Sequence, residues 1–494
     1  MGNALGVDIG TTGIKMILVS SEGTILGTWT QPHDLCSPQA GFAEEDPLVW
    51  KAHVLDLLRE VVGAGFAVDA IGVTGMVPAL VALDHQGNPV RPSIQQNDNR
   101  ADKEMESLRS QFPDSMMLSR TGTRLNQQHI PPKVLWLKAH EPEAYQAIAH
   151  ITGSYGYVAF LLTGNLVTER NWALESGMYD LHQERWIDEV LQAGSVSATW
   201  LPPVVKPTDV VGHVTDGVSR MTGLKKGIPV VAGTADHVAS AFCVGARREG
   251  DLVFKLGGAG DILLAVNNLV TDPRLFIDYG CTPQAPYFLN GCTATCGSLL
   301  KWFERELNLP DFTVMDERAS HIQPTSEGVT ILPYFLGEKT PIFDSHAKGT
   351  IFGLTLHHTK DHIYRALLEA VAYSINHHVE IMKERNLPIR RVFITNGGSK
   401  SKLWRQILAD VTGYDVRYVR NNPGSCLGAA LLAGMGAGLF DAGVPDRFLT
   451  EGEDNHHDPA LRPVYDQGYQ RYRALYEALK PLMRRTDQEL GESV

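Results

Sequence analysis

The sequence predicts an α/β protein made of two similar lobes with a cleft between them. Short apolar segments alternate with amphipathic helices along the chain, which is the order that an α/β fold requires. A glycine-rich segment at 9–19 has a counterpart at 256–266 with the same succession of apolar, small and glycine residues. At 494 residues the chain is also too long for a single hydrophobic core. Duplication of one α/β unit explains these three observations together.

The first half of the chain opens with strands and a helix. Residues 4–19 and the segment that begins at Gly23 read as strands joined by the polar turn SSEG. A helix is expected after Asp46, because Pro47 stands at its first position and apolar residues recur on one side of it. Residues 70–76 then form a short apolar run of the buried-strand type.

A less regular segment follows, from about 97 to 219, and we expect it to be an inserted subdomain with helices near 129–145 and 154–164. From Gly227 the pattern gives a strand, a glycine turn and a helix of small residues. The amino-terminal lobe, which includes the insertion, is therefore placed at 1–245.

The second half repeats the alternation and is placed at 246–494. Strand-like segments at 328–337 and 391–400 alternate with helical segments at 359–384 and 401–413. Residues 422–438 form a helix with such small side chains that another element must pack closely against it, and we interpret this as a helix lying on a sheet.

Composition limits the classes of function. Apolar residues make up 43% and charged residues 20%, as in ordinary globular enzymes. The net charge of −12 argues against a nucleic-acid partner, because phosphate backbones are bound by clustered Lys and Arg. The sequence contains no apolar run long enough for a membrane span, and it leaves no room for a leader before the first strand. The six cysteines follow no disulfide spacing, which favours the cytoplasm.

Asp8 stands inside an apolar strand, between Val7 and Ile9. A carboxylate in that place is costly to bury unless something pairs with it, and a Mg²⁺ ion is a suitable partner. The alternative is a strained turn in which the aspartate caps local N–H groups.

Two glycine turns that face one another across a cleft would suit a nucleoside triphosphate, because glycine lets backbone N–H groups approach phosphate oxygens. Thr11 and Thr12 add hydroxyl donors to the first turn, and Lys15 adds a cation. The chain has no G-x-x-x-x-G-K-S/T motif, and no G-x-G-x-x-G follows a strand with an acidic residue at the expected distance. The sequence therefore predicts phosphate turns that lie between strands.

Asp236 follows a buried strand and begins a helix. Such an aspartate is either a helix N-cap or, if its loop opens into the cleft, a general base for an alcohol. Further along, Gly397 and Gly398 end a strand, where a flat base can lie against the backbone, although helix capping explains these glycines equally well.

Together these segments resemble the FGGY carbohydrate kinases over essentially the whole chain. The segment GTIFGLTLHHTKDHIYRALLE (349–369) fits the carboxy-terminal signature of that family, DIGTTGIK resembles its first phosphate motif, and GTADHVASA is similar to its catalytic segment. The resemblance implies two duplicated ribonuclease-H-like or actin-like ATPase lobes, with ATP and Mg²⁺ as cofactors.

Within the family the chain is most similar to xylulokinase-like members, which implies that a ketopentose such as xylulose is phosphorylated. By this resemblance Asp236 is the general base and Asp8 helps to hold Mg²⁺. The implied phosphate contacts are Thr11, Thr12, Lys15, Gly257, Gly258 and Gly260, and the implied adenosine contacts are Gly397, Gly398 and Ser399. The implied substrate contacts are Met76, Asn97, Asp98 and His237.

Three departures from the family pattern leave the identity of the substrate undecided. Val77 and Pro78 replace the usual His-Gly, His237 replaces a frequent Asn, and the second turn has Gly258 and Ala259 where Thr-Ser is usual. The alternatives are a kinase for another polyol, sugar acid or hydroxylated signalling molecule, and a degenerate, non-catalytic ATP-binding homologue. An ATP-driven binding protein of the heat-shock type would need a substrate-binding region after the lobes. Family members are often dimers, so the resemblance is compatible with a homodimer, although the sequence does not determine the oligomeric state.

Overall fold

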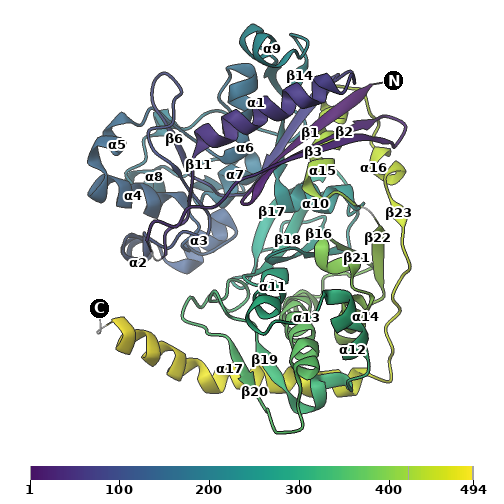
Figure 1. Ribbon diagram of the computed structural model, residues 1–494. Coiled ribbons are helices and arrows are strands. Elements are labelled where there is room, and N and C mark those ends of the chain that lie inside the picture. Colours follow the sequence, from purple (N-terminus) through teal and green to yellow (C-terminus); the bar gives the residue numbers. More distant parts are fainter. Residues whose placement is uncertain (1, 40, 421, 492–494) are drawn as a thin grey trace.

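The computed structural model describes residues 2–39, 41–420 and 422–491, and it has two lobes, each built around a large mixed sheet (Figure 1). Within these residues the apolar core divides into two large clusters. One lies in the second lobe, and the other extends from the first lobe across α15 (Ser425–Gly436) to one face of the second sheet. None of the helices in the described ranges is both long enough and apolar enough to cross a membrane.

The first sheet has the strand order β13-β14-β5-β1-β2-β3. Its strands are β1 (Asn3–Gly10), β2 (Gly13–Ser20), β3 (Ile25–Pro32), β5 (Ala70–Gly75), β13 (Val210–His213) and β14 (Pro229–Ala235). β1 is antiparallel to β2 and parallel to β5, and β5 is parallel to β14. A hairpin at one edge is thus followed by parallel strands.

The second sheet repeats this arrangement in the order β17-β18-β16-β15-β21-β22-β23. Its strands are β15 (Asp251–Leu256), β16 (Gly260–Val266), β17 (Phe276–Thr282), β18 (Ala285–Thr293), β21 (Arg391–Thr395), β22 (Val416–Arg420) and β23 (Thr450–Glu451). β15 is antiparallel to β16 and parallel to β21, just as β1 is to β2 and β5. The predicted duplication is confirmed.

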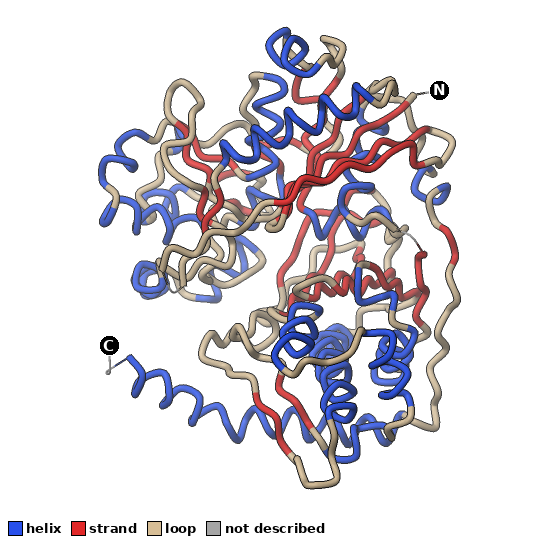
Figure 2. Tube along the Cα trace, viewed as in Figure 1, coloured by secondary structure: helices blue, strands red, loops and turns tan. Residues whose placement is uncertain are grey.

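Helices cover both faces of the first sheet (Figure 2). α1 (Pro47–Gly63) and α6 (Ser154–Thr163) lie on one face, and α10 (Asp236–Cys243) and α15 (Ser425–Gly436) lie on the other. α1 begins as the sequence predicts, because the Asp46 side chain accepts a hydrogen bond from the backbone of Leu48 and Pro47 follows it.

The remaining elements complete the two lobes. In the first half these are β4 (Glu44–Glu45), β6 (Val81–Leu83), β7 (Ser93–Ile94), α2 (Asp102–Gln111), α3 (Asp114–Thr121), α4 (Ile130–His140), α5 (Pro142–Ala147), β8 (His150–Thr152), β9 (Thr168–Glu169), α7 (Arg170–Glu175), β10 (Tyr179–Asp180), β11 (Arg185–Trp186), α8 (Asp188–Ala193), η1 (Ala198–Trp200), β12 (Val204–Val205) and α9 (Asp216–Thr222). In the second half they are α11 (Gly297–Glu306), α12 (Phe312–Ser320), η2 (Pro324–Gly328), β19 (Thr330–Leu332), β20 (Thr350–Phe352), α13 (Lys360–Glu384), η3 (Gly397–Lys400), α14 (Lys402–Thr412), α16 (Val444–Arg447) and α17 (Arg462–Gly491).

Three elements depart from a simple division of the chain into an insertion and two halves. β13 and α6 fall within the range expected as an inserted subdomain, 97–219, but β13 pairs with β14 and α6 packs on β14 and β5. α15 comes from the second half of the chain but packs on β1 and β5 of the first sheet (Figure 1). The interpretation of this helix as one that lies on a sheet is confirmed.

The approach of α15 is so close that it requires glycines. A Cβ atom on Gly6 of β1 would lie 2.0 Å from the carbonyl oxygen of Cys426, and one on Gly428 would lie 2.2 Å from that of Ala239 in α10. The small side chains of α15 therefore bring its amino-terminal end against β1, next to Asp8.

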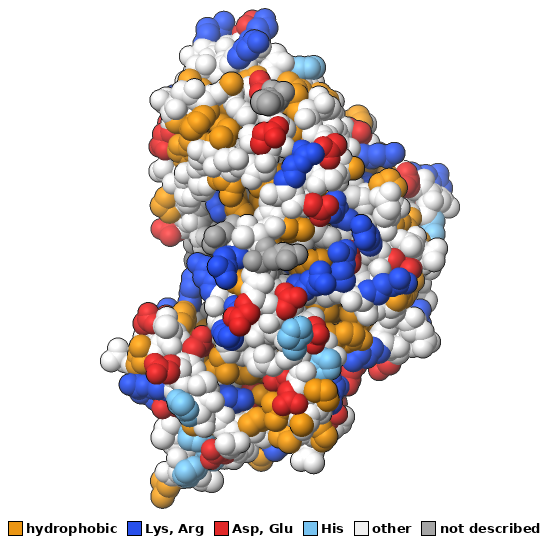
Figure 3. Space-filling view, turned by 90° about the vertical axis from the view of Figure 1, so that its right-hand side faces the viewer, with side chains coloured by type: hydrophobic (Ala, Val, Ile, Leu, Met, Phe, Trp, Pro, Cys, Tyr) orange, Lys and Arg blue, Asp and Glu red, His pale blue; other side chains and the backbone are white. Residues whose placement is uncertain are grey.

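The surface carries charges of both signs. On the face seen in Figure 3, Lys and Arg side chains gather near the middle but are interspersed with Asp and Glu. This face therefore offers no continuous basic surface, which agrees with the acidic net charge of −12.

Candidate active site

A cavity of about 360 Å³ lies between the two lobes. The turn between β1 and β2 contributes Gly10, Thr11 and Thr12 to its wall, and the turn between β15 and β16 contributes Gly257 and Gly258. The duplicated hairpins therefore place their glycine turns at one cavity, as the sequence predicts for phosphate turns.

Asp236 reaches this cavity because β14 bulges just before it. The pairing of β14 with β5 shifts register between Val231 and Thr234, and Gly233 within this bulge has a φ of +68°. A Cβ atom at Gly233 would lie 1.5 Å from the carbonyl oxygen of Val73, so only glycine fits there. The bulge ends the strand at the cavity.

Asp236 is the first residue of α10, and Ala235 is the N-cap, with no side-chain capping bond at this helix end. Its carboxylate instead faces cations. Lys255 Nζ donates to Oδ2 of Asp236 at 3.3 Å, and Nδ1 of His237 lies 3.4 Å from Oδ1. Burial alone would raise the pKa of Asp236, but Lys255 and His237 outweigh it and hold that pKa well below its usual range. Asp236 is therefore ionised at neutral pH.

Asp8 lines the same cavity from β1. Burial, and then repulsion by Asp236, raise the pKa of Asp8 to about 6. Ser425, at the start of α15, donates its Oγ–H to Oδ2 of Asp8 at 2.6 Å. The sequence predicts that buried Asp8 has a partner. The structure supplies one such partner, the hydroxyl of Ser425, from a distant part of the chain.

The two hairpins carry opposite charges at matching places. Asp8 stands across from Lys15 in the first hairpin, and Lys255 stands across from Asp261 in the second. Lys255 Nζ lies 3.1 Å from Oδ2 of Asp261 as well as near Asp236. Sequence reasoning missed Lys255, although its place two residues before Gly257 matches that of Asp8 before Gly10.

Lys15 does not line the cavity. Its Nζ donates to the carbonyl oxygen of Pro423 at 3.3 Å, just before α15. Its charge still lowers the pKa of Asp8, although less than burial raises it. Lys15 therefore acts on the site from behind the first turn.

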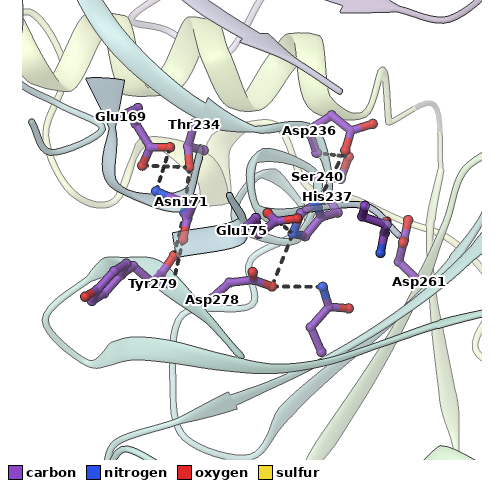
Figure 4. A network of polar contacts seen from close by, with 12 residues as sticks. Glu169, Asn171, Glu175, Thr234, Asp236, His237, Ser240, Asp261, Asp278 and Tyr279 are labelled. Carbon is purple, nitrogen blue, oxygen red and sulfur yellow. Dashed lines mark hydrogen bonds and ion pairs between the residues drawn. The ribbon is translucent and has the colours of Figure 1, made fainter. Parts of the chain in front are cut away.

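His237 is the centre of a buried polar network (Figure 4). Its Nε2 lies 3.2 Å from Oδ2 of Asp278 and 3.6 Å from Oε1 of Glu175, and Asn290 donates to the same Asp278 oxygen at 2.8 Å. Burial opposes a charge on His237, but Asp278 and Glu175 raise its pKa well above the usual value. Burial raises the pKa of Glu175 well above its usual range. An imidazolium therefore stands beside the carboxylate of Asp236.

The wall beyond Asp236 is formed by Met76, Val77, Pro78, Gln96, Gln128 and His129. Two lysines hold Gln128: Lys133 donates to its backbone carbonyl at 3.0 Å, and Lys339 of the second lobe donates to its side-chain oxygen at 3.1 Å. Burial lowers the pKa of Lys133 to about 7. This wall is part apolar and part polar, and Lys339 of the second lobe lines the cavity beside it.

Two residues predicted to contact substrate lie elsewhere. Asn97 is exposed and is not part of the cavity wall. Asp98 is 1% exposed, and its oxygens accept hydrogen bonds from the backbone of Ala43 at 2.6 Å and from Arg100 at 2.8 Å. Asp98 thus supports the segment that carries Gln96.

The segment predicted to contact adenosine borders the second turn. Asn396 lines the cavity, whereas Gly397, Gly398 and Ser399 in η3 lie just behind it. Space beside Gly397 is open, but a Cβ atom on Gly398 would meet Trp404 at 2.6 Å. Gly260 also lies behind the wall, because a Cβ atom there would meet Thr293 at 2.8 Å.

Comparison with known proteins agrees with this architecture. Residues 3–243 match the N-terminal domain of the FGGY family of carbohydrate kinases, and residues 266–437 match its C-terminal domain. A solved structure of xylulose kinase from Rhodospirillum rubrum is 39% identical, with a TM-score of 0.90 over 98% of this chain and 100% of that one. The predicted fold of two actin-like ATPase lobes is confirmed.

Curated relatives extend over nearly the full length. A probable L-xylulose kinase from Pasteurella multocida is 30% identical over 98% of this chain and 100% of its own, and a xylulose kinase from Staphylococcus xylosus is 28% identical over 89% and 92%. The chain therefore belongs to the FGGY family of carbohydrate kinases.

Proposed function

We propose that this protein transfers the γ-phosphate of ATP to a hydroxyl of a small sugar, a ketopentose such as xylulose. The observation that carries the proposal is the ionised carboxylate of Asp236, which faces a cavity between two glycine turns. Relatives named xylulose kinase, one of them 39% identical, support the choice of sugar.

Phosphate oxygens would be held by the backbone N–H groups of the two turns. Thr11 and Thr12 supply hydroxyl donors in the first turn, whereas Gly258 and Ala259 supply none in the second. The missing hydroxyl contacts are worth about 0.5–1.5 kcal/mol each, a loss that backbone donors can offset. The adenosine would lie by Asn396 and Gly397, where the space is open.

The residues present fit Mg²⁺. Asp8 offers a hard oxygen ligand, and the nearby charge of Asp236, which raises the pKa of Asp8, makes this end of the cavity attractive to a cation. When bound, Mg²⁺ would neutralise charge on the phosphate oxygens.

Asp236 would accept the proton of the sugar hydroxyl as the hydroxyl oxygen attacks the γ-phosphate. Lys255 and His237 keep this carboxylate ionised, and their positive charges favour the approach of phosphate. The sugar would lie against Met76, Gln128 and His237, which line the cavity beside Asp236. Closure of the lobes would exclude water, which competes as a nucleophile.

ADP release in the presence of ATP, Mg²⁺ and single sugars tests the proposal. We expect turnover with one enantiomer of xylulose that exceeds turnover with other ketopentoses, polyols and sugar acids. Preference for a polyol or sugar acid would support kinase activity but contradict a ketopentose as the substrate. The difference in substrate would then be attributed to Val77 and Pro78 in the cavity wall. ATP binding without turnover on any sugar would identify a non-catalytic homologue.

The six cysteines, all within the described ranges, are free thiols, which supports a cytoplasmic location. Formation of a homodimer stays a prediction.

A further inference from the structure

A second cluster of ligand-type side chains lies outside the cavity, at the amino-terminal end of α13. Glu327 belongs to η2, His357 lies in the loop that precedes α13, and His362 lies in the first turn of that helix. None of these residues lines the cavity between the lobes.

The three side chains converge on one point. Oε2 of Glu327 lies 3.0 Å from Nε2 of His357 and 3.6 Å from Nε2 of His362, and all three atoms lie within 4.8 Å of one another. Ligands bound at about 2.1 Å around a tetrahedral Zn²⁺ lie ~3.4 Å apart, so the two spacings from Glu327 need only a small adjustment.

His362 provides an independent observation. Its residue is 5% exposed, and its Nε2 has no hydrogen-bond partner, because the Glu327 oxygen at 3.6 Å is beyond hydrogen-bond range. Buried polar atoms in proteins are almost always satisfied. The other ring nitrogen, Nδ1, accepts a hydrogen bond from the backbone N–H of Thr359 at 3.1 Å and lies 3.0 Å from Oγ1 of the same residue. Metal binding therefore requires the other tautomer, in which Nδ1–H donates to Oγ1, the capping bond from the backbone is given up and Nε2 carries the lone pair. Metal-binding imidazoles are fixed in this way by a hydrogen bond from the second nitrogen.

We propose that Glu327, His357 and His362 bind one divalent transition-metal ion, of which Zn²⁺ is the best fit. Two imidazoles and one carboxylate form a frequent zinc ligand set, with the fourth position open to water, whereas Mg²⁺ and Ca²⁺ prefer oxygen ligands alone. The proposal does not depend on the kinase activity.

The ion would fasten η2 to α13. Glu369, further along α13, already holds η2, since it accepts hydrogen bonds from the backbone of Thr325 at 2.9 Å and from Ser326 Oγ at 2.7 Å. The metal would add a second attachment two turns earlier in the helix, next to the core of the carboxy-terminal lobe. Bound metal is therefore expected to raise the thermal midpoint of unfolding.

The test uses the full chain without an affinity tag, freed of metal with a chelator. Titration with Zn²⁺, followed by calorimetry, is expected to give one saturable equivalent and a higher midpoint of unfolding. Co²⁺ in place of Zn²⁺ is expected to give a visible spectrum without a thiolate charge-transfer band, because no cysteine belongs to the site.

Three variants make the test specific. His357→Ala removes an exposed ligand, and His362→Gln removes the imidazole but keeps a side chain that can form the capping box at Thr359. Each of these two substitutions is expected to weaken Zn²⁺ binding at least tenfold and to abolish the rise in the midpoint of unfolding. The control is His456→Ala, an exposed histidine that pairs with Asp415 at 2.9 Å elsewhere on the surface. Retention of binding in His357→Ala, equal loss in the control, or a thiolate band would overturn the proposal.

Discussion

Asp236 combines two properties at the residue scale, since it is ionised and it faces the cavity in which the proposed hydroxyl would lie. Asp236→Asn keeps the shape of the side chain but cannot accept a proton. We expect kcat to fall by on the order of 10²–10⁴, with ATP affinity unchanged, measured by steady-state kinetics and calorimetry. Asp56→Asn, an exposed carboxylate paired with Arg59, is the control. Ordinary turnover in Asp236→Asn would remove this residue from the role of base.

Lys255 sets the pH range in which Asp236 is ionised, because its charge is the largest of the effects that lower the Asp236 pKa. The carboxylate accepts a proton only when ionised, so kcat declines as the pH falls through its pKa. With Lys255 present that decline lies below the ordinary carboxyl range.

In Lys255→Met the pKa of Asp236 rises, and the acidic decline of kcat is expected to move to higher pH. The pH profile of kcat measures this shift, with the exposed Lys301→Met as control. A profile whose acidic limb stays in place would show that Lys255 does not govern the ionisation of Asp236.

At the scale of elements, the contact between α15 and α10 depends on the absence of a side chain. Gly428→Ala places a methyl group 2.2 Å from the carbonyl oxygen of Ala239, so one helix must move. We expect a loss of roughly 1–3 kcal/mol in the free energy of unfolding, measured with denaturant. Because α15 carries Ser425, which bonds Asp8, activity should fall as well.

Gly63→Ala is the matched control, since a Cβ atom at this end of α1 meets nothing within 4 Å. Its free energy of unfolding should stay the same or rise slightly, as alanine favours helix over glycine. Equal stability of the two variants would mean that α15 has room to adjust.

At the scale of the whole molecule, Asn171 joins the two lobes (Figure 4). It accepts a hydrogen bond from the backbone N–H of Tyr279 at 2.7 Å, and its Nδ2 donates to the Tyr279 carbonyl at 3.0 Å and to Thr234 at 2.9 Å. An α7 side chain of the first lobe thus pairs with strand β17 of the second.

Asn171→Ala would leave these buried backbone groups unpaired. We expect a loss of about 1–3 kcal/mol in stability, seen as a lower thermal midpoint, because an unsatisfied buried donor is costly. Asn99→Ala, at an exposed position, should leave the midpoint unchanged. An unchanged midpoint in Asn171→Ala would show that other contacts hold the lobes together.

The sequence by itself determined the features that local stereochemistry controls. The glycine turns after β1 and β15, the start of α1 at Asp46-Pro47 and the buried strand that leads to Asp236 follow from residue periodicity and backbone preference within a few residues. These patterns also carried the family resemblance, and through it the candidate base.

Only the tertiary structure decided which charges meet. Ser425 reaches Asp8 from 417 residues away, Lys255 crosses from the second hairpin to Asp236, and α15 joins the sheet of the other lobe. The tertiary structure also pairs Asp98 with Arg100, away from the cavity wall. The pKa of a buried group depends on neighbours in space, and separate segments become neighbours only when the sheets and helices have packed.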